Sequence, residues 1–293
     1  MFAYDFDRLN ILLESVLQKS LTPESWKWLR DAGKAVRAND DIAKFNIAFV
    51  AMPRKTGKNM VTVSAGAERE MKGLRKDLHI KGWTVDQLSR VWLLMQLKPE
   101  DKERYIAAIE NLFMNGEMGE LVALYASIPL LAYPESWRKR CAEGIRSNIG
   151  QVLESIICNN PYPAEQLDEA AWNQLVLKAI FTGKPLLEIT GLRERRNPNL
   201  AQSLVDYAHE RWAAHRELNP VVWICVSPFI VSANFSDIQH VFHSEDPLER
   251  DAAALACYES PYEPARKMVD RDENLKRDIQ SGKITWEAVA ERL

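Results

Sequence analysis

Apolar residues recur every three to four positions along nearly the whole chain. Near the N-terminus they fall at i, i+3, i+4, i+7 and i+8, which places one apolar stripe along a helix. The stripe consists of Leu9, Leu12, Leu13, Val16 and Leu17. Sustained alternation, the strand pattern, is confined to NMVTVSA at 59–65, which is too short to start a sheet. The pattern therefore predicts an all-α protein.

Prolines and capping residues mark where many of these helices begin. Thr22 followed by Pro23 predicts an N-cap and a first helical residue, because the first helical N–H groups lack partners anyway. Six more prolines stand at or near the head of other apolar-periodic segments: Pro99, Pro134, Pro163, Pro198, Pro220 and Pro247. The chain therefore reads as a dozen or so helices joined by short turns.

Two further helices have boundaries that can be predicted from local signals. Thr84 and Gln87 have the spacing of a capping box and open a helix predicted over Val85 to Leu97. Another helix begins near Ile42 and is expected to stop near Pro53, because proline disrupts a helix interior.

Serial helices of this kind favour an irregular α-superhelix, that is, a HEAT-like helical repeat solenoid. The clearest repeat-like unit is SEDPLERDAAALACYES at 244–260, whose alanines would let neighbouring helices approach closely. No strict period runs through the chain, and no low-complexity linker interrupts it. We therefore predict a single all-helical domain over 1–293, with 262–293 as a charged helical C-terminal extension.

Composition narrows the functional classes. Among 293 residues, 38 are Lys or Arg and 41 are Asp or Glu, and the resulting net charge of −3 argues against a nucleic-acid-binding face. No apolar run is long enough to span a bilayer, and the start, MFAYDFDRLN, is acidic where a signal peptide is basic. The four cysteines form no CxxC pair. We expect a cytoplasmic protein with reduced thiols, without a nucleic-acid partner and without a direct membrane span.

Several apparent motifs fail on inspection. The stretch RKTGKNM at 54–60 resembles a phosphate loop, but Met52 stands where the pattern needs glycine and Asn59 where it needs Ser or Thr. Cys225 sits in an apolar segment with nothing nearby to lower its pKa, so we predict a buried inert thiol. Ser227 lacks the G-x-S-x-G elbow of acyl-transfer enzymes.

The histidines raise the question of a metal. His240 and His243 lie one helical turn apart, and His209 with Glu210 would add ligands from another helix. No HExxH motif exists, and spacing alone does not bring those helices together. We predict neither a metal nor a cofactor, and interpret these histidines as surface or interface residues.

Polar and aromatic residues mix on three successive predicted helices. In 138–150, Glu143 and Arg146 are i, i+3 neighbours, and Gly144 would allow close helix approach. A helix predicted over Ala164 to Phe181 carries Trp172 on its apolar stripe. On the next long helix, Asp206, His209 and Glu210 share one side. Such faces line a polar pocket, or else form a buried hydrogen-bond network with ordinary surface ion pairs.

Three long blocks stand out within these helices: GELVALYASIPLLAYPESWRKRCAEGIRSNI, NPYPAEQLDEAAWNQLVLKAIF and NPNLAQSLVDYAHERWAAH. They resemble the EboA-like family of bacterial proteins, and the likeness extends over roughly residues 40–260. Members of this family are encoded beside a prenyltransferase-like membrane protein and hydrolase-like and isomerase-like proteins. The resemblance implies a role in making or exporting small secondary metabolites, with proteins of the same cluster as partners. It brings no established reaction and no catalytic residues.

The leading hypothesis is a non-catalytic protein that binds a small metabolite or partner proteins. The candidate ligand-binding residues are Arg146, Asn148, Asn160, Tyr162, Trp172, Asn173, Lys178, Asp206, His209 and Arg211. Among them, the cations would hold an anionic group, the aromatic rings would stack on a ligand ring, and Asn173 would orient it. One alternative is an enzyme in which His209, with Asp206 or Glu210, acts as an acid–base group. Another is a scaffold for neighbouring enzymes.

Overall fold

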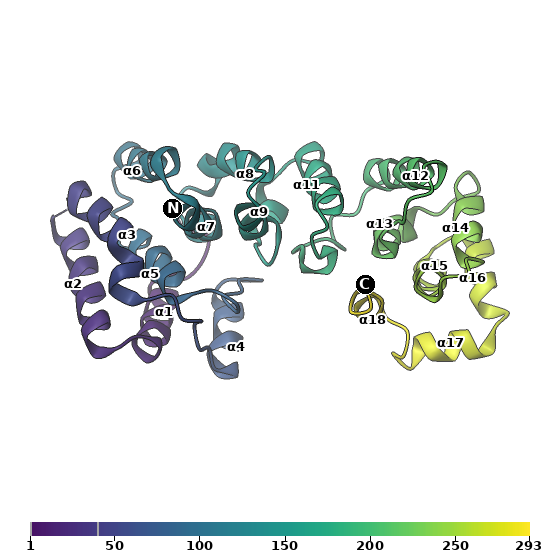
Figure 1. Cartoon of the computed structure of the whole chain (residues 1–293), viewed down its shortest axis with the longest axis horizontal. Helices are drawn as coiled ribbons and strands as arrows, with labels where there is room; N and C mark the ends of the chain where they lie inside the picture. The colour runs from purple at the N-terminus through teal and green to yellow at the C-terminus, as the bar shows by residue number, and fades with distance from the viewer. Residues whose placement is uncertain (1, 40) are drawn as a thin grey trace. The chain divides into compact units, whose positions relative to one another are not determined.

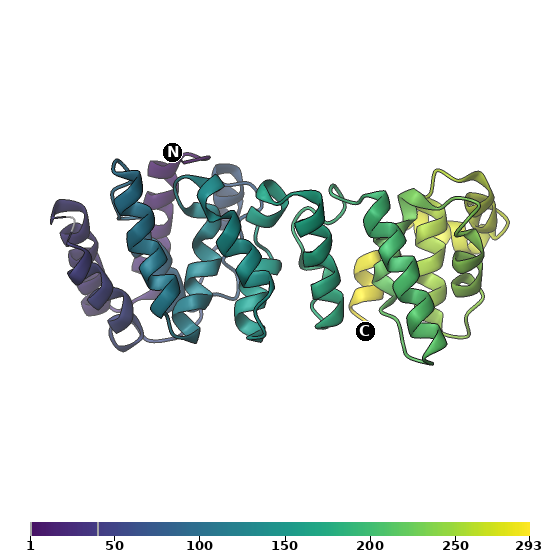
Figure 2. The same cartoon turned by 90° about the horizontal axis from the view of Figure 1, so that it is seen from above.

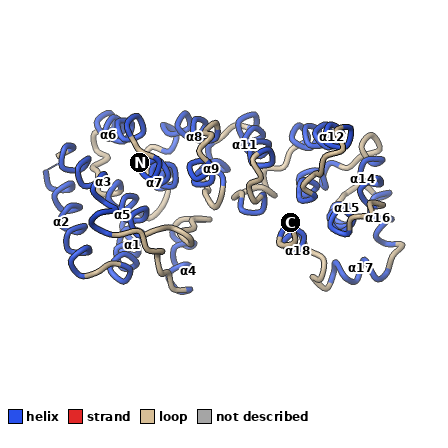
Figure 3. The backbone as a smooth tube through the Cα atoms, in the orientation of Figure 1, coloured by secondary structure: helices blue, strands red, loops and turns tan. Residues whose placement is uncertain are grey.

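The computed structural model describes residues 2–39 and 41–293. Within these ranges the prediction of an all-α protein is confirmed: there are eighteen α-helices and five short 3-10 helices (Figure 3). The described residues contain no strand, and an isolated bridge joins Met60 and Thr84. The chain divides into two compact units, Met1–Asp168 and Glu169–Leu293, and each is described separately. The single all-helical domain over 1–293 stays a prediction.

The N-terminal unit is built from α-helices in close succession (Figure 1). Its elements are α1 (Phe6–Ser20), α2 (Pro23–Asn39), α3 (Ile42–Thr56), α4 (Ala65–Leu74), α5 (Val85–Leu94), α6 (Lys102–Asn115), α7 (Met118–Ser127), η1 (Ile128–Leu130), η2 (Pro134–Trp137), α8 (Arg138–Ile145), α9 (Gly150–Ile157) and α10 (Tyr162–Gln166). Helix α5 packs against α3 and α7, and α7 packs in turn against α9.

The C-terminal unit is arranged around α15, which contacts α13, α14, α16 and α18 (Figures 1 and 2). Its elements are α11 (Glu169–Phe181), η3 (Leu186–Glu188), α12 (Pro198–Ala213), η4 (Pro220–Val222), α13 (Trp223–Val226), η5 (Ser227–Phe229), α14 (Phe235–Phe242), α15 (Pro247–Glu259), α16 (Glu263–Asp270), α17 (Glu273–Gln280) and α18 (Trp286–Ala290). The alanines of α15 are buried, as its composition predicted, and so admit close neighbours.

Helix starts follow the predicted local signals. Four of the five stripe residues of α1 are buried, and Leu12 is half-buried. Helix α2 begins at Pro23, and the Thr22 hydroxyl accepts a hydrogen bond from the backbone N–H of Ser25 at 3.2 Å. Pro198 and Pro247 likewise begin α12 and α15. These signals hold because capping depends on residues within one turn.

The prediction that α3 stops near Pro53 is wrong. The helix continues through Pro53 to Thr56 and ends at Gly57, whose φ is 77°. Proline removes the N–H that would bond the Phe49 carbonyl one turn earlier. That carbonyl instead accepts a hydrogen bond from Nε of Arg90 at 3.0 Å. A partner from α5 therefore replaces the lost helical bond.

Arg90 is buried at the centre of this region, with 3 % of its surface exposed. Its guanidinium donates to Asp86 at 2.9 Å, lies 3.9 Å from a carboxylate oxygen of Glu120, and sits over the Phe49 ring. Burial lowers the pKa of Arg90, and the charges of Asp86 and Glu120 oppose that shift. The arginine therefore ties α3, α5 and α7 together as a satisfied buried cation.

The capping box predicted at the start of α5 is also wrong, although the helix does begin at Val85. The Thr84 hydroxyl donates to the Asp86 carboxylate at 2.6 Å and does not cap the helix. The same carboxylate pairs with Arg90, so this threonine serves the buried cation. The helix ends at Leu94, short of the predicted Leu97.

The helix predicted over Ala164 to Phe181 is two helices, α10 and α11, because Leu167 leaves helical geometry with ψ of 145°. Asp168, a residue type favoured at helix N-caps, stands directly before the first residue of α11. Leu167 is buried, which fits a turn held by apolar packing.

The last segment, 262–293, forms α16, α17 and α18. Trp286 of α18 is buried, and its indole N–H donates to Glu259 of α15 at 2.8 Å. Glu259 also accepts from Arg193 and Ser227, so one carboxylate joins three parts of this unit. Among the described residues, no helix is both long and apolar enough to cross a membrane.

Candidate functional site

The turn at 159–162 is held together by its own polar groups. The Asn160 amide donates to the carbonyls of Tyr125 and Ser155 and accepts from the backbone N–H of Tyr162. Tyr162 is fully buried, and its hydroxyl donates to the Pro134 carbonyl at 2.5 Å. The polar groups of both predicted site residues are therefore engaged in hydrogen bonds within the fold.

The other two candidates of the N-terminal unit, Arg146 and Asn148, are exposed where α8 ends and α9 has not yet begun. The expected pairing of Glu143 with Arg146 is not formed: Glu143 accepts from Arg140 at 2.7 Å, and Arg140 also pairs with Glu110 of α6. Glu143 pairs with Arg140 and not with Arg146 because Arg140 is half-buried and bridges two carboxylates. Charge pairing is stronger in a half-buried position than at the surface.

On α11, the predicted residues fix the join to α12. Trp172 is completely buried, with the guanidinium of Arg195 4.8 Å from its ring centre. Asn173 and Asn197 exchange two side-chain hydrogen bonds, at 3.2 and 2.8 Å, and Asn197 is the N-cap of α12. Lys178 is half-buried near the end of α11. This stretch resembles the predicted buried network more than an open pocket wall.

On α12, the predicted residues point in different directions. Arg211 lies over the ring of Tyr207, which also contacts α11 through Phe181. Asp206 accepts from Gln202 one turn earlier at 2.9 Å. His209 instead faces α14. The helix therefore separates Arg211 from His209.

The strongest concentration of accessible chemistry lies between α12 and α14. His209 Nε2 is 2.8 Å from a carboxylate oxygen of Asp237, and the His209 side chain is 53 % exposed against 16 % for Asp237. Trp212 is half-buried, and its ring centroid lies 5.6 Å from that of His209 and 4.7 Å from that of His240, the latter in a T-shaped arrangement. Behind it, Trp212 stacks on the buried ring of Trp223. We name these four residues, His209, Trp212, Asp237 and His240, the imidazole–indole cluster.

The cluster has the properties of a recognition surface for a ring. Trp223 supports Trp212 from behind, so the indole is held in place and its outer side remains partly accessible. Asp237 holds the His209 imidazole at one ring nitrogen, which leaves the other for a ligand. His240 also lines an open polar depression with His243 along α14.

Sequence reasoning selected His209 but missed its carboxylate partner. The partner is Asp237 on α14, whereas the sequence analysis expected Asp206 or Glu210. A signal existed, because Asp237 and His240 are three residues apart and so share one face of a short helix. Their meeting with α12 depends on tertiary packing.

Metal binding finds no support in the cluster. Among the described residues, no group of three or more His, Cys, Asp or Glu side chains is arranged to hold a metal ion. His209 and His240 each contact the ring of Trp212, and an indole is not a metal ligand.

The cysteines are separate from the cluster, and three of them are buried. Burial raises the pKa of Cys141, Cys225 and Cys257 to about 12, which confirms the buried thiol predicted at Cys225. Because only the thiolate reacts, we expect these three to resist Ellman's reagent at about pH 8 in the native protein. The half-buried Cys158 should react, and all four should react in guanidinium. Labelling of Cys225 at a rate near that of Cys158 in the folded chain would contradict this.

Comparison with known proteins gives one match. A family model described as metabolite traffic protein EboA matches residues 9–227. No curated protein matches the chain, and neither does any solved structure. The resemblance stated from the sequence blocks covers roughly residues 40–260. The family match begins earlier, at residue 9, and also ends earlier, at residue 227. It includes His209 and Trp212, whereas Asp237 and His240 lie beyond it.

Proposed function

Because the chain belongs to the EboA family of metabolite traffic proteins, we propose that it binds a small metabolite without transforming it, in a system that makes or exports that metabolite. The observation that carries the proposal is the imidazole–indole cluster, in which a half-buried Trp212 stacks on Trp223 and contacts two histidine rings. Such a surface suits a flat ring bearing a hydrogen-bonding group.

The ten residues singled out from the sequence enter this proposal in two roles. Asn160, Tyr162, Trp172 and Asn173 position helices, since each is packed or bonded within its own unit. The more accessible residues contact the metabolite or the partner proteins that are encoded beside this one. They are Arg146, Asn148, Lys178, Asp206, His209 and Arg211.

The finer architecture and setting belong to the same proposal. We infer a HEAT-like succession of helix pairs, supported by the packing of α5, α7 and α9 in series. We also infer a cytoplasmic protein whose partners are proteins and a small molecule, with no nucleic acid, in keeping with its slight net negative charge.

Acid–base catalysis is the second candidate, and the 2.8 Å contact between His209 and Asp237 favours it. A carboxylate that orients an imidazole is a common arrangement for a general base. In this reading the partner of His209 is Asp237, and the metabolite would be bound over Trp212 and then converted.

Two variants separate binding from catalysis. If the protein only binds, Trp212→Ala should weaken metabolite retention about tenfold, the loss of one good ring contact. His209→Gln should change retention less than about threefold, because the glutamine amide can still hydrogen-bond the ligand. Mass analysis of small molecules extracted from the purified proteins measures both. Trp28→Ala, which removes another half-buried tryptophan far along the sequence, is the matched control.

The outcomes are distinct. Retention unchanged in Trp212→Ala would refute the cluster as the binding site and favour a scaffold. A folded His209→Gln protein that holds its ligand while the host stops producing the converted compound would establish catalysis instead.

A further inference from the structure

Helix α2 of the N-terminal unit carries a row of cations along one side. The members follow one another at intervals of three or four residues, which places them on one stripe of a helix: Lys27, Arg30, Lys34 and Arg37. All four side chains are exposed, and none has an ion-pair partner among the described residues. At about 1.5 Å of rise per residue, the row extends over roughly 15 Å. We name these four residues the basic stripe.

The apolar side of α2 fixes the helix within its unit. Leu29 and Val36 are buried, and a Cβ added to Gly33 would lie 2.4 Å from the ring of Trp92 on α5. The basic stripe lies on a different side of the helix, and α2 forms one edge of the N-terminal unit (Figure 1). The stripe is therefore built on a fixed helix and is open to a partner.

Positive charge extends beyond the stripe to the whole α2–α3 pair. Residues 23–58 contain eight Lys or Arg against four Asp or Glu, in a chain whose net charge is −3. The basic turn at 54–58, which does not form a phosphate loop, lies beside the start of α2. The Ser25 hydroxyl holds it there, because it donates to the Lys55 carbonyl at 2.7 Å.

The carboxylates of this pair offset only part of that charge. Glu24 and Asp31 of α2 lie on the flank of the stripe next to Lys27, and neither has an ion-pair partner among the described residues. Asp41 is engaged, because it pairs with Lys44 at 3.3 Å. On α2 itself, four cations therefore stand against two carboxylates.

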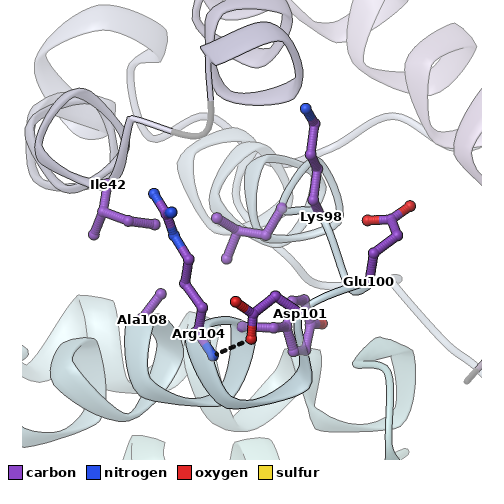
Figure 4. A pocket seen from close by; sticks show the side chains of 8 residues that line it. Ile42, Lys98, Glu100, Asp101, Arg104 and Ala108 are labelled. Carbon is purple, nitrogen blue, oxygen red and sulfur yellow. Dashed lines mark hydrogen bonds between the residues drawn. The ribbon is translucent and has the colours of Figure 1, made fainter.

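A nearby cavity at the start of α6 shows the contrast. Lys98 and Arg104 line it together with Glu100 and Asp101, so its charges balance (Figure 4). Asp101 stays negative while it caps α6 through the N–H of Arg104 at 3.1 Å. Such a rim favours neither sign of ligand charge, whereas the basic stripe favours an anionic partner.

We propose that the basic stripe docks the protein on an anionic lipid bilayer. The surface of a helix is convex, so its cations contact several anions at once and do not converge on one. Clusters of four or more Lys and Arg on a helix are typical of binding to anionic lipids. Protein interfaces instead have apolar or aromatic cores that are poor in lysine, and the stripe has no apolar member.

The charge of the remaining chain supports this orientation. Outside residues 23–58, acidic residues outnumber basic ones, so a negative membrane would attract the α2 edge and repel the rest. Docking of this kind needs no membrane-spanning helix. It is also independent of the imidazole–indole cluster.

Co-sedimentation of the full chain with two kinds of vesicle tests the proposal. One kind contains phosphatidylcholine alone, and the other contains about one third phosphatidylserine. We expect the chain to bind the anionic vesicles at least about tenfold more strongly than the neutral ones. It should be released at about 1 M salt, where the Debye length falls to about 3 Å. Equal binding to both vesicles, or none to the anionic ones, would overturn the proposal.

Charge variants locate the contact. Arg30→Glu combined with Lys34→Glu should weaken vesicle binding at least about tenfold, and because both side chains are exposed, folding should be undisturbed. Asp31→Asn removes a carboxylate beside the stripe and should strengthen binding at least about twofold. Arg69→Glu combined with Lys72→Glu, on exposed positions of α4, is the matched control with the same change of net charge. Equal losses in the two double variants would overturn the proposal.

Competition separates lipid from other anionic partners. Polyglutamate stands for an acidic protein and duplex RNA for a nucleic acid, each added at the same concentration of negative charge as the vesicles. We expect the chain to stay with the vesicles. Complete displacement by either polymer would assign the basic stripe to that class of partner and overturn the assignment to lipid.

Discussion

Replacing Arg90 with methionine is expected to lower the free energy of unfolding by about 3–5 kcal/mol, the usual cost of removing one partner from a buried ion pair. The variant would leave the buried carboxylates of Asp86 and Glu120 without their cation. It would also leave the Phe49 carbonyl without a donor, because Pro53 has no N–H to give. Urea unfolding followed by circular dichroism measures the change.

The role of Pro53 can be tested within the same series. In the Arg90→Met background, Pro53→Ala restores an N–H to the Phe49 carbonyl and should recover about 1 kcal/mol. In the native background the same change should gain less, because Arg90 already serves that carbonyl. The two substitutions should therefore be non-additive. Strict additivity would show that Arg90 does not substitute for the missing helical bond.

Arg8→Met is the matched control for Arg90→Met. Arg8 lies in the same unit and approaches Glu70 at 3.9 Å, but 65 % of its side chain and 50 % of that of Glu70 are exposed. An exposed pair contributes at most about 1 kcal/mol, so the control should change stability little. Similar losses in Arg8→Met and Arg90→Met would contradict the assignment of Arg90 as a buried organiser.

Gly144→Ala should destabilise the chain by about 1–3 kcal/mol, the range for overpacking a well-filled contact. A Cβ at this position of α8 would lie 2.6 Å from the ring of Tyr125 on α7. That ring also packs edge-on against Phe113, so it has little freedom to withdraw. The close helix approach that the sequence predicts at Gly144 is therefore a contact with Tyr125 of α7.

Gly119→Ala is the control for Gly144→Ala, because Gly119 is also helical but nothing lies within 4 Å of its added Cβ. Alanine is the better helix former, so the control should leave stability unchanged or raise it by up to about 1 kcal/mol. Thermal unfolding of both variants decides the matter. A gain of stability in Gly144→Ala would show that α7 and α8 are not in close contact there.

Local signals predicted the fold class and most helix starts. The apolar stripe of α1 and the cap and proline at Thr22 and Pro23 act within one or two turns of chain, so the sequence contains them in full. The errors at Pro53 and Thr84 have a different origin. In each case the buried Arg90 of α5 changes the outcome, because it donates to the Phe49 carbonyl and pairs with the Asp86 carboxylate that accepts from Thr84. The burial of Arg90 results from tertiary packing, which the local sequence does not show.

The candidate site was less predictable for the same reason. Periodicity identified residue types on polar faces, but burial then separated Trp172 and Tyr162, which are packed, from His209, which is accessible. The missing partner, Asp237, lies on another helix and reaches His209 only in the folded unit. Trp212, which is not among the residues selected from the sequence, is half-buried over Trp223.

Native mass spectrometry of the full chain, purified gently from its own source beside Trp212→Ala, tests the central claim of metabolite binding most directly. We predict an added small-molecule mass on the native protein that is lost from Trp212→Ala and kept by Trp28→Ala. A bare chain in all three proteins, or an adduct that survives Trp212→Ala undiminished, would contradict the proposed binding at the imidazole–indole cluster.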